Sequence, residues 1–281
     1  MNKKITRQSV GIDVAQKELV VCLGRKYEDW STDLYGHKCF ANTEKGYLSL
    51  LAWVNKLMDG SVPVQFVMEA TGVYHESLAY FLDGKGYNLS IVLPNKISNY
   101  ARSLDTKTVT DRTASEAIAL FGLERKLENW KRPKGIFKKV RQLCRERDQV
   151  VQARTVAKNQ LHAEQAEAEP HKRSIARIKQ QIALFNKQEK EIRKDIAELI
   201  EQDKEVKEAI ERISTSPGIG SLTATIVLAE TNGFELIRNR RQVASYAGFD
   251  IKEKQSGTSV KGKPRISKKG NKYLRGAMHM P

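Results

Sequence analysis

The 281-residue sequence predicts an α/β domain over residues 1–128, a long helical coiled-coil connector over 129–213 and a mainly α-helical C-terminal domain over 214–281. Three observations predict this division. Short apolar runs alternate with amphipathic helical patterns up to about residue 125, a heptad repeat follows, and glycine-containing turns and a basic tail close the chain. Strands interleaved with helices are typical of a three-layer α/β domain.

The elements of the first domain follow from their apolar periodicity. Residues 9–14 and 18–23 are strand-like runs separated by a short turn, which predicts a hairpin. Thr43 and Glu44 are typical of a helix start, and the helical pattern that follows runs through Leu57. The remaining elements are expected as a strand at 62–69, a helix at 74–82, a strand at 88–94 and a helix at about 111–127.

The middle of the chain carries a heptad pattern. A helix is expected over about 137–168, and Pro170 interrupts it. Apolar residues then recur in steps of three and four from Ile175 to Ile213, broken only by Glu189 and Asp203. One continuous helix over this range would span about 57 Å. Both a hairpin with the preceding helix and an interface between subunits satisfy this seam.

The charge balance points to a polyanionic partner. Lys and Arg number 49 against 33 Asp and Glu, which gives a net charge of +16. Residues 131–148 hold eight basic and two acidic residues, and residues 251–275 hold nine basic and one acidic. Such clustering favours nucleic-acid binding over a uniformly basic surface. With a mean hydropathy of -0.53 and no apolar run of about 20 residues, an integral membrane protein is excluded.

Cysteine and histidine usage gives no sign of a zinc site. Cys22, Cys39 and Cys144 are far apart, no CxxC spacing exists, and no two histidines have ligand spacing. The N-terminus is basic but lacks the apolar stretch of a secretion signal. We therefore expect a protein of the reducing cytoplasm without structural zinc.

Three acidic residues of the first domain are candidate metal ligands. Asp13 lies in the first expected strand, Glu69 ends another, and Asp111 opens a helix. Carboxylates that converge at strand ends repel one another unless a cation holds them, and Mg²⁺ or Mn²⁺ suits oxygen ligands. A purely structural alternative exists for each acid, since Asp111 could simply cap its helix.

Two further features lie in the C-terminal domain. Pro217-Gly218-Ile219-Gly220 precedes a helical pattern and resembles the turn of a helix-hairpin-helix element, although an ordinary turn between helices uses the same residues. Ser256, followed by Gly257, lies in a basic loop. This serine is either a plain loop residue or a nucleophile that attacks phosphate clamped by Lys and Arg.

Taken in chain order, these motifs resemble the transposases of the insertion sequence 110 family. The resemblance covers nearly the whole chain, although the middle helices match only in character. It rests on Gly11-Ile12-Asp13-Val14, Glu69-Ala70-Thr71-Gly72-Val73-Tyr74, Thr110-Asp111-Arg112, Ile118-Ala119, Pro217-Gly218-Ile219-Gly220, Tyr246-Ala247-Gly248, Ser256-Gly257 and the run from Ile266 to Arg275.

The resemblance implies a ribonuclease-H/RuvC-like N-terminal domain in which four acids bind Mg²⁺ (or Mn²⁺), three of them at Asp13, Glu69 and Asp111. It implies that Ser256 joins covalently to DNA and that a structured RNA encoded beside the gene guides the choice of donor and target DNA. The implied assembly is a tetramer of paired dimers. The implied location is the cytoplasm of a prokaryote, at the nucleoid when DNA is bound, with no membrane partner.

Two departures from the family pattern are visible. The fourth acid should lie three residues after Asp111, where the sequence has Ala114. Glu116 lies about 140° around the helix from Asp111 and is a poor substitute. Either this copy is naturally defective or the alanine was introduced to disable cutting, and the intact remaining motifs favour the second explanation. Family members also continue beyond residue 281, so we expect a truncated chain or a disordered continuation.

The sequence therefore predicts a DNA transposase or recombinase, with activity impaired at position 114. The alternatives are a RuvC-type junction-resolving nuclease that uses water as nucleophile, and a nucleic-acid-binding protein without catalysis. Residues expected to contact nucleic acid are Lys131, Arg132, Lys138, Lys139, Arg141, Gly218, Gly220, Lys252, Lys254, Lys261, Lys263, Arg265, Lys268 and Lys269.

Overall fold

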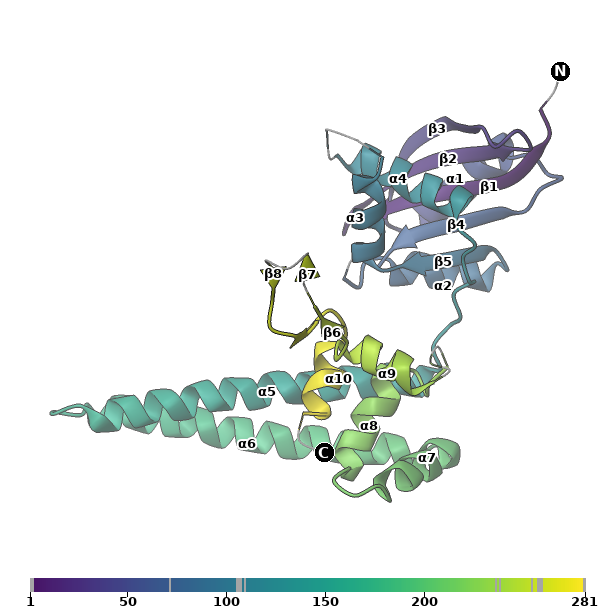
Figure 1. Cartoon of the computed structure of the whole chain (residues 1–281). Coiled ribbons are helices and arrows are strands. Elements are labelled where there is room, and N and C mark those ends of the chain that lie inside the picture. Colours follow the sequence, from purple (N-terminus) through teal and green to yellow (C-terminus); the bar gives the residue numbers. More distant parts are fainter. Residues whose placement is uncertain are drawn as a thin grey trace. The chain divides into compact units, whose positions relative to one another are not determined.

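A five-stranded mixed sheet lies at the centre of the N-terminal part of the computed structural model (Figure 1). The structure describes residues 3–70, 72–104, 108, 110–235, 237, 239–253, 255–256 and 260–279, with only the backbone described at 255, 256, 260 and 261. The chain divides into two units, Met1–Arg132 and Pro133–Pro281. The expected boundary between residues 213 and 214 stays a prediction.

The sheet has the order β3-β2-β1-β4-β5. Strands β1 (Ile5–Val14), β2 (Glu18–Tyr27) and β3 (Thr32–Ala41) are antiparallel, which confirms the expected hairpin and adds an unpredicted third strand. Strands β4 (Val64–Glu69) and β5 (Asn88–Val92) extend the sheet in parallel with β1. The carboxyl ends of β1, β4 and β5 therefore meet at one edge of the sheet.

Helices cover both faces of this sheet. Helices α1 (Glu44–Leu57) and α2 (Glu76–Gly84) share one apolar cluster with β1, β2 and β4. Helices α3 (Pro94–Arg102) and α4 (Asp111–Glu124) form a second cluster on the opposite face. The expected strand at 88–94 was too long, because β5 ends at Val92 and Pro94 occupies the first turn of α3, where proline is favoured.

Two long helices dominate the second unit. Helix α5 (Gly135–Ala166) and helix α6 (Lys172–Glu201) lie side by side and form a helical hairpin within one chain (Figure 1). The continuous helix expected from Ile175 to Ile213 is wrong. Helix α6 ends at Glu201, and α7 (Lys204–Ser214) begins after Asp203, whose side chain accepts a hydrogen bond from the Val206 N–H at 3.1 Å.

The heptad seam was broken at Asp203 because that residue caps a new helix. The other break has a different cause. Glu189 is buried in α6 and accepts hydrogen bonds from Arg147 and Arg154 of α5 and from Arg193 of its own helix. A charge in an apolar seam is tolerated when such partners surround it.

The remaining elements are short. The turn that contains Gly218, which has a φ of 84°, leads into α8 (Ser221–Glu230), and α9 (Arg240–Ala247) follows. Two small ribbons pair β6 (Ile251–Lys252) with β9 (Arg265–Ile266) and β7 (Gln255–Ser256) with β8 (Val260–Lys261). Helix α10 (Lys272–Ala277) ends the described chain.

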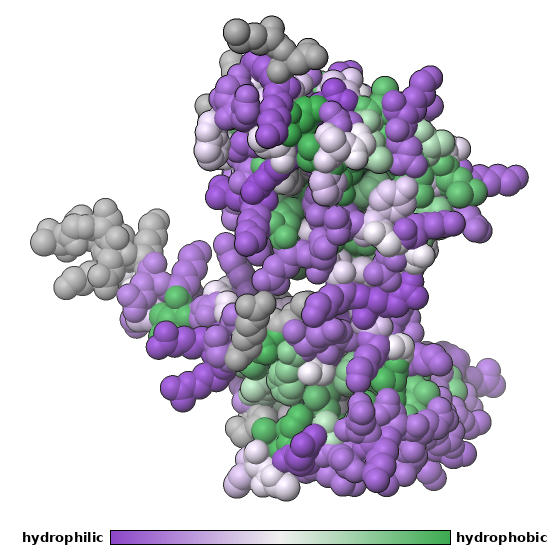
Figure 2. Space-filling view, turned by 90° about the vertical axis from the view of Figure 1, so that its right-hand side faces the viewer, coloured by the Kyte–Doolittle hydropathy of each residue, from purple (hydrophilic) through white to green (hydrophobic). Residues whose placement is uncertain are grey.

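The surface is mainly hydrophilic on the face shown in Figure 2. Among the described residues, no helix combines the length and the apolar character needed to cross a membrane. Cys22, Cys39 and Cys144 are all free thiols.

Candidate functional site

Strand register places Asp13 beside Glu69. Strands β1 and β4 are parallel neighbours, and Gly11 and Ile12 pair with Val67 and Met68. One residue further along each strand are Asp13 and Glu69. Alternation directs both side chains to the face away from Ile12 and Met68, which belong to the α1–α2 cluster. The two carboxylates therefore lie on the same face at the same level of adjacent strands.

Helix α4 lies across this face because small residues permit a close approach. A Cβ added at Gly11 would lie 2.3 Å from the Ser115 carbonyl oxygen and the Ala119 amide nitrogen. A Cβ at Gly122 would lie 2.3 Å from Ser9 Oγ. The helix thus runs antiparallel to β1, with its first residue, Asp111, toward the Asp13 end of the strand.

Electrostatics link the three acids. The pKa of Asp13 is raised from 3.8 to about 6, first by burial and then by the negative charges of Asp111 and Glu69. A hydrogen bond from the Val14 backbone opposes this change. The structure therefore brings the three expected carboxylates to one end of the sheet, where their charges repel.

These carboxylates have the donor chemistry of a Mg²⁺ site, since unbalanced carboxylate charge favours a hard cation. Across the described residues, no three His, Cys, Asp or Glu side chains converge closely enough to form a complete ligand set. Ala114, half-buried one turn into α4, presents a methyl group at the position where we expect a fourth acid.

Glu116 does not replace the missing acid. Its carboxylate lies 2.8 Å from His37 Nε2 on β3 and 3.3 Å from Arg112 Nε. Glu116 also contributes, after burial, to the raised pKa of Cys22 on β2. The side chain thus faces the β2–β3 side of the sheet rather than the Asp13 end.

Asn42 forms hydrogen bonds to the segments that follow Asp13 and Glu69, and this role was not predicted from the sequence. Its Nδ2 donates to the Ala15 carbonyl at 2.9 Å and to the Tyr74 carbonyl at 3.1 Å, while its Oδ1 accepts from Tyr47. Ala15 lies two residues after Asp13, and Tyr74 lies in the segment that follows Glu69. One amide therefore fixes both loops, through contacts that no local sequence pattern indicates.

Ser256 lies in β7, where its backbone pairs with Val260. Its side chain is outside the described part of the structure, as are Lys254, Gly257 and the side chain of Lys261. Lys252, Lys263, Arg265, Lys268 and Lys269 are all exposed. Gly218 and Gly220 are exposed in the turn between α7 and α8, which leaves their expected phosphate contacts a prediction.

Fewer side chains of the basic cluster at 131–148 are free to contact nucleic acid than its composition suggests. Arg132 pairs with Asp83 at 3.0 Å, donates to the Tyr80 carbonyl and stacks on the Tyr80 ring. Among the described ion pairs, Arg132, Lys134, Arg145 and Arg147 of this cluster each pair with an acid. Lys131 and Lys139 are exposed, and Lys138 and Arg141 are half-buried.

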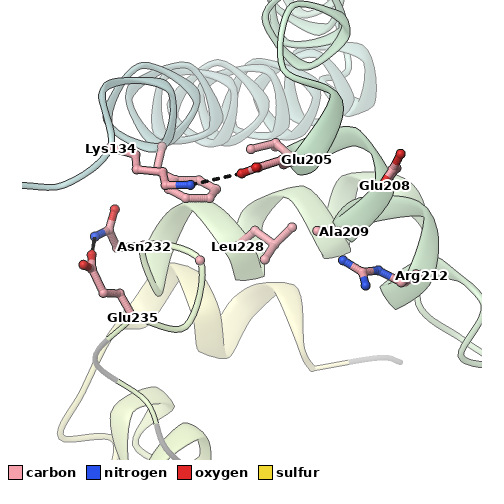
Figure 3. A pocket seen from close by; sticks show the side chains of 11 residues that line it. Lys134, Glu205, Glu208, Ala209, Arg212, Leu228, Asn232 and Glu235 are labelled. Atoms are coloured by element: carbon pink, nitrogen blue, oxygen red, sulfur yellow. Dashed lines mark hydrogen bonds and ion pairs between the residues drawn. The ribbon is translucent and has the colours of Figure 1, made fainter.

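A pocket of about 480 Å³ lies in the second unit among α5, α7 and α8 (Figure 3). Phe137, Val206 and Leu228 contribute apolar surface to its lining, and Lys134 and Glu205 form an ion pair across it. None of the expected catalytic residues lines this pocket.

Sequence profiles place the chain among the transposases. A profile described as Transposase, of the DEDD type of IS110 elements, matches residues 10–165, and a second matches residues 210–281. The first match alone spans more than half of the chain. The chain belongs to the IS110 transposase family of this first profile, a family of DNA transposases or recombinases, and the second profile is described as the Transposase IS116/IS110/IS902 family.

Two relatives and two solved structures show similarity to this chain. The pilin gene-inverting proteins of Moraxella bovis and Moraxella lacunata are each 26% identical over 278 residues, covering 99% of this chain and 82% of theirs. Among solved structures, Thermus thermophilus RuvC with a Holliday junction substrate matches 40% of this chain and 90% of its own, with 10% identity and a TM-score of 0.31. The yeast mitochondrial Holliday junction resolvase matches 43% and 80%, with 14% identity and a TM-score of 0.32.

Proposed function

We propose that this chain is a DNA recombinase in which Asp13, Glu69 and Asp111 hold Mg²⁺ (or Mn²⁺) in a RuvC-like domain and Ser256 attacks a DNA phosphate. The observation that carries the proposal is the placement of Asp13 level with Glu69, with Asp111 close enough to raise the Asp13 pKa. Three acids from three elements whose negative charges repel one another supply the oxygen ligands that a hard divalent cation prefers.

The chemistry divides between the two parts of the chain. A bound divalent cation supplies positive charge for a phosphate and its leaving oxygen. Ser256 Oγ loses its proton and forms a bond to phosphorus as a phosphorus–deoxyribose oxygen bond breaks, and the released oxygen takes up one proton, so that the step is balanced. Lys252 and Lys263, near Ser256 in the chain, neutralise charge on the phosphate. The acids and the serine act together either within one chain or between two subunits.

The wider assembly follows the family resemblance. A structured guide RNA selects donor and target DNA, and paired dimers form the active tetramer at the nucleoid in the cytoplasm. The Moraxella relatives are pilin gene-inverting proteins, and inversion of a gene supports rearrangement of DNA segments as the outcome. Ala114 reduces or abolishes cutting in this copy.

Two alternatives have distinct signatures. A junction-resolving nuclease would use the acids with water as nucleophile and would not depend on Ser256. A binding protein without catalysis would stay inactive even with a fourth acid in place.

Restoring the fourth acid tests the metal site. Ala114→Asp should raise Mg²⁺ affinity in calorimetry by about tenfold, because another charged oxygen ligand joins the cluster, and should raise DNA cleavage. Ala52→Asp, which adds the same charge at an exposed position of α1, is the control and should change neither. Equal results from both variants would contradict the four-acid site.

A further inference from the structure

Glu230, the last residue of α8, is a buried carboxylate with a complete set of donors. The residue is 2% exposed. Arg145 Nε and Nη2 donate to its two oxygens, each at 2.8 Å, and Asn271 Nδ2 donates at 2.6 Å. A bidentate arginine gives both strength and a fixed geometry, and a buried charge that loses such a partner is strongly unfavourable.

The partners of Glu230 connect segments that are distant in sequence. Arg145 is on α5, and its guanidinium also lies 4.6 Å from the centre of the Tyr273 ring on α10. Asn271 caps α10 by accepting from the Tyr273 and Leu274 N–H groups, each at 2.9 Å. Glu230 thus joins α5, α8 and the start of α10 at one point.

The same point holds both ends of the segment that carries Ser256. The Asn271 N–H donates to the Tyr246 carbonyl at 2.7 Å, and the Tyr246 hydroxyl donates to the Glu230 carbonyl at 3.2 Å. Tyr246 precedes the ribbons and Asn271 follows them. The two chain ends are therefore fixed to each other and to Glu230.

Backbone contacts hold the two chain ends together from Tyr246 and Gly270 toward the strands. A Cβ at Gly270 would lie 2.4 Å from the Tyr246 carbonyl oxygen, so the two chain ends touch directly. The Lys268 N–H then donates to the Gly248 carbonyl at 3.0 Å, and the Ser267 N–H to the Asp250 carbonyl at 2.7 Å. The chain then pairs in β6–β9, next to these contacts, and again in β7–β8, a separate two-stranded ribbon that contains Ser256.

We propose that Glu230 is a positioning residue for Ser256. Together with Arg145 and Asn271 it fixes the base of the serine ribbon, defined as strands β6, β7, β8 and β9, on helices α5 and α8. The inference rests on the proposed role of Ser256. It adds the group of residues that orients the ribbon on which Ser256 lies. Glu230 itself touches neither DNA nor the reacting atoms in this scheme.

The test compares Glu230→Gln and Asn271→Ser with Glu189→Gln, all in the Ala114→Asp background. Serine at 271 keeps a helix-capping oxygen but loses the donor to Glu230. Glu189→Gln is the matched control. Glu189 is also a buried acid bound by arginines, but it lies on α6 and its partners Arg147 and Arg154 lie on α5, so none of them belongs to the ribbon. It should lower the melting temperature without affecting the ribbon.

Two readouts separate positioning from stability. In Glu230→Gln and Asn271→Ser, the Ser267 and Lys268 amides should exchange hydrogen about tenfold faster than in the parent, because the ribbon base opens locally. The rate of protein–DNA adduct formation at saturating DNA should fall by about tenfold, while the DNA dissociation constant stays within about twofold. The Glu189→Gln protein should keep the parent's exchange and adduct rates.

Unchanged amide exchange in both variants would show that Glu230 does not hold the ribbon. Faster exchange with an unchanged adduct rate, or an equal loss of adduct in Glu189→Gln, would overturn the positioning role. A parent protein that forms no adduct would refute the serine mechanism and Glu230's catalytic part in it, while amide exchange would still decide whether Glu230 anchors the ribbon.

Discussion

Asp13 is a carboxyl group of the N-terminal unit whose pKa is raised. Burial and the charges of Asp111 and Glu69 together favour its protonated form, so its carboxylate is destabilised at neutral pH. This is the environment expected where a protein keeps negative charges together for a cation. The half-buried methyl group of Ala114 leaves the cluster one carboxylate short of the family pattern.

The Asp13 pKa makes a prediction about stability against pH. The folded protein keeps the Asp13 proton up to about pH 6, whereas the unfolded chain loses it near 3.8. The folded state binds more protons between these values, so the contribution of Asp13 to stability falls as pH rises through that window. Asp13→Asn should therefore raise the melting temperature at pH 8 without divalent cation, and the gain should vanish below about pH 4.

Thermal melts followed by circular dichroism between pH 3.5 and 8 check this prediction. Asp33→Asn, a change at an exposed acid of β3, serves as control and should give a smaller gain at pH 8. A gain for Asp13→Asn that is constant with pH would contradict the electrostatic explanation.

At the scale of elements, the contact between α4 and β1 decides where the acids lie. Ser9, Gly11 and Asp13 lie on one face of β1, and Gly11 provides the space in which the Ser115 and Ala119 backbone atoms lie. Because helix backbone cannot yield as a flexible side chain does, a side chain at position 11 must move the whole helix, and Asp111 with it.

Gly11→Ala should destabilise the protein by about 1–3 kcal/mol through overpacking and weaken Mg²⁺ binding in the Ala114→Asp background. The matched control is Gly60→Ala, because a Cβ at Gly60 meets no atom within 4 Å. Urea denaturation and calorimetry measure the two effects. The explanation fails if Gly11→Ala and Gly60→Ala are equally stable.

Elements with strong periodicity could be predicted from the sequence, and those fixed by distant partners could not. The β1–β2 hairpin and α1 carry apolar patterns and a capping residue, Thr43, that indicate them locally. Strand β3 mixes polar and apolar residues without strict alternation, and α3 begins with a proline, so neither pattern was distinctive. The roles of Asn42 and Glu230 could not be predicted, because their partners Tyr74 and Arg145 lie 32 and 85 residues away along the chain.

For the whole molecule, the distribution of free positive charge matters more than its total. Arg132, Lys134, Arg145 and Arg147 of the 131–148 cluster are paired with acids, whereas Lys263, Lys268 and Lys269 of the C-terminal cluster are exposed. Exposed cations are those that replace counterions on a nucleic-acid backbone. The C-terminal cluster is therefore expected to dominate the salt dependence of binding.

The slope of log affinity against log salt for duplex DNA should be on the order of 6 to 8, with about 0.9 per phosphate contacted. Replacing Lys263, Lys268 and Lys269 by Ala should lower this slope by about 3. Lys187 and Lys194, exposed on α6 but paired with Glu191 and Glu198, form the control, and their replacement should leave the slope unchanged. A slope near one for the unaltered protein would show that these basic residues are solvated and do not contact DNA phosphates.

The most direct test of the recombinase mechanism is detection of a covalent protein–DNA species. The Ala114→Asp protein is incubated with Mg²⁺ and labelled DNA that carries the target junction, then analysed under denaturing conditions. A denaturation-resistant adduct should form, and Ser256→Ala should abolish it while the DNA dissociation constant stays within about twofold. An adduct that persists in Ser256→Ala, or DNA cleavage by the Ala114→Asp protein without any adduct, would contradict the serine mechanism and favour a nuclease that uses water.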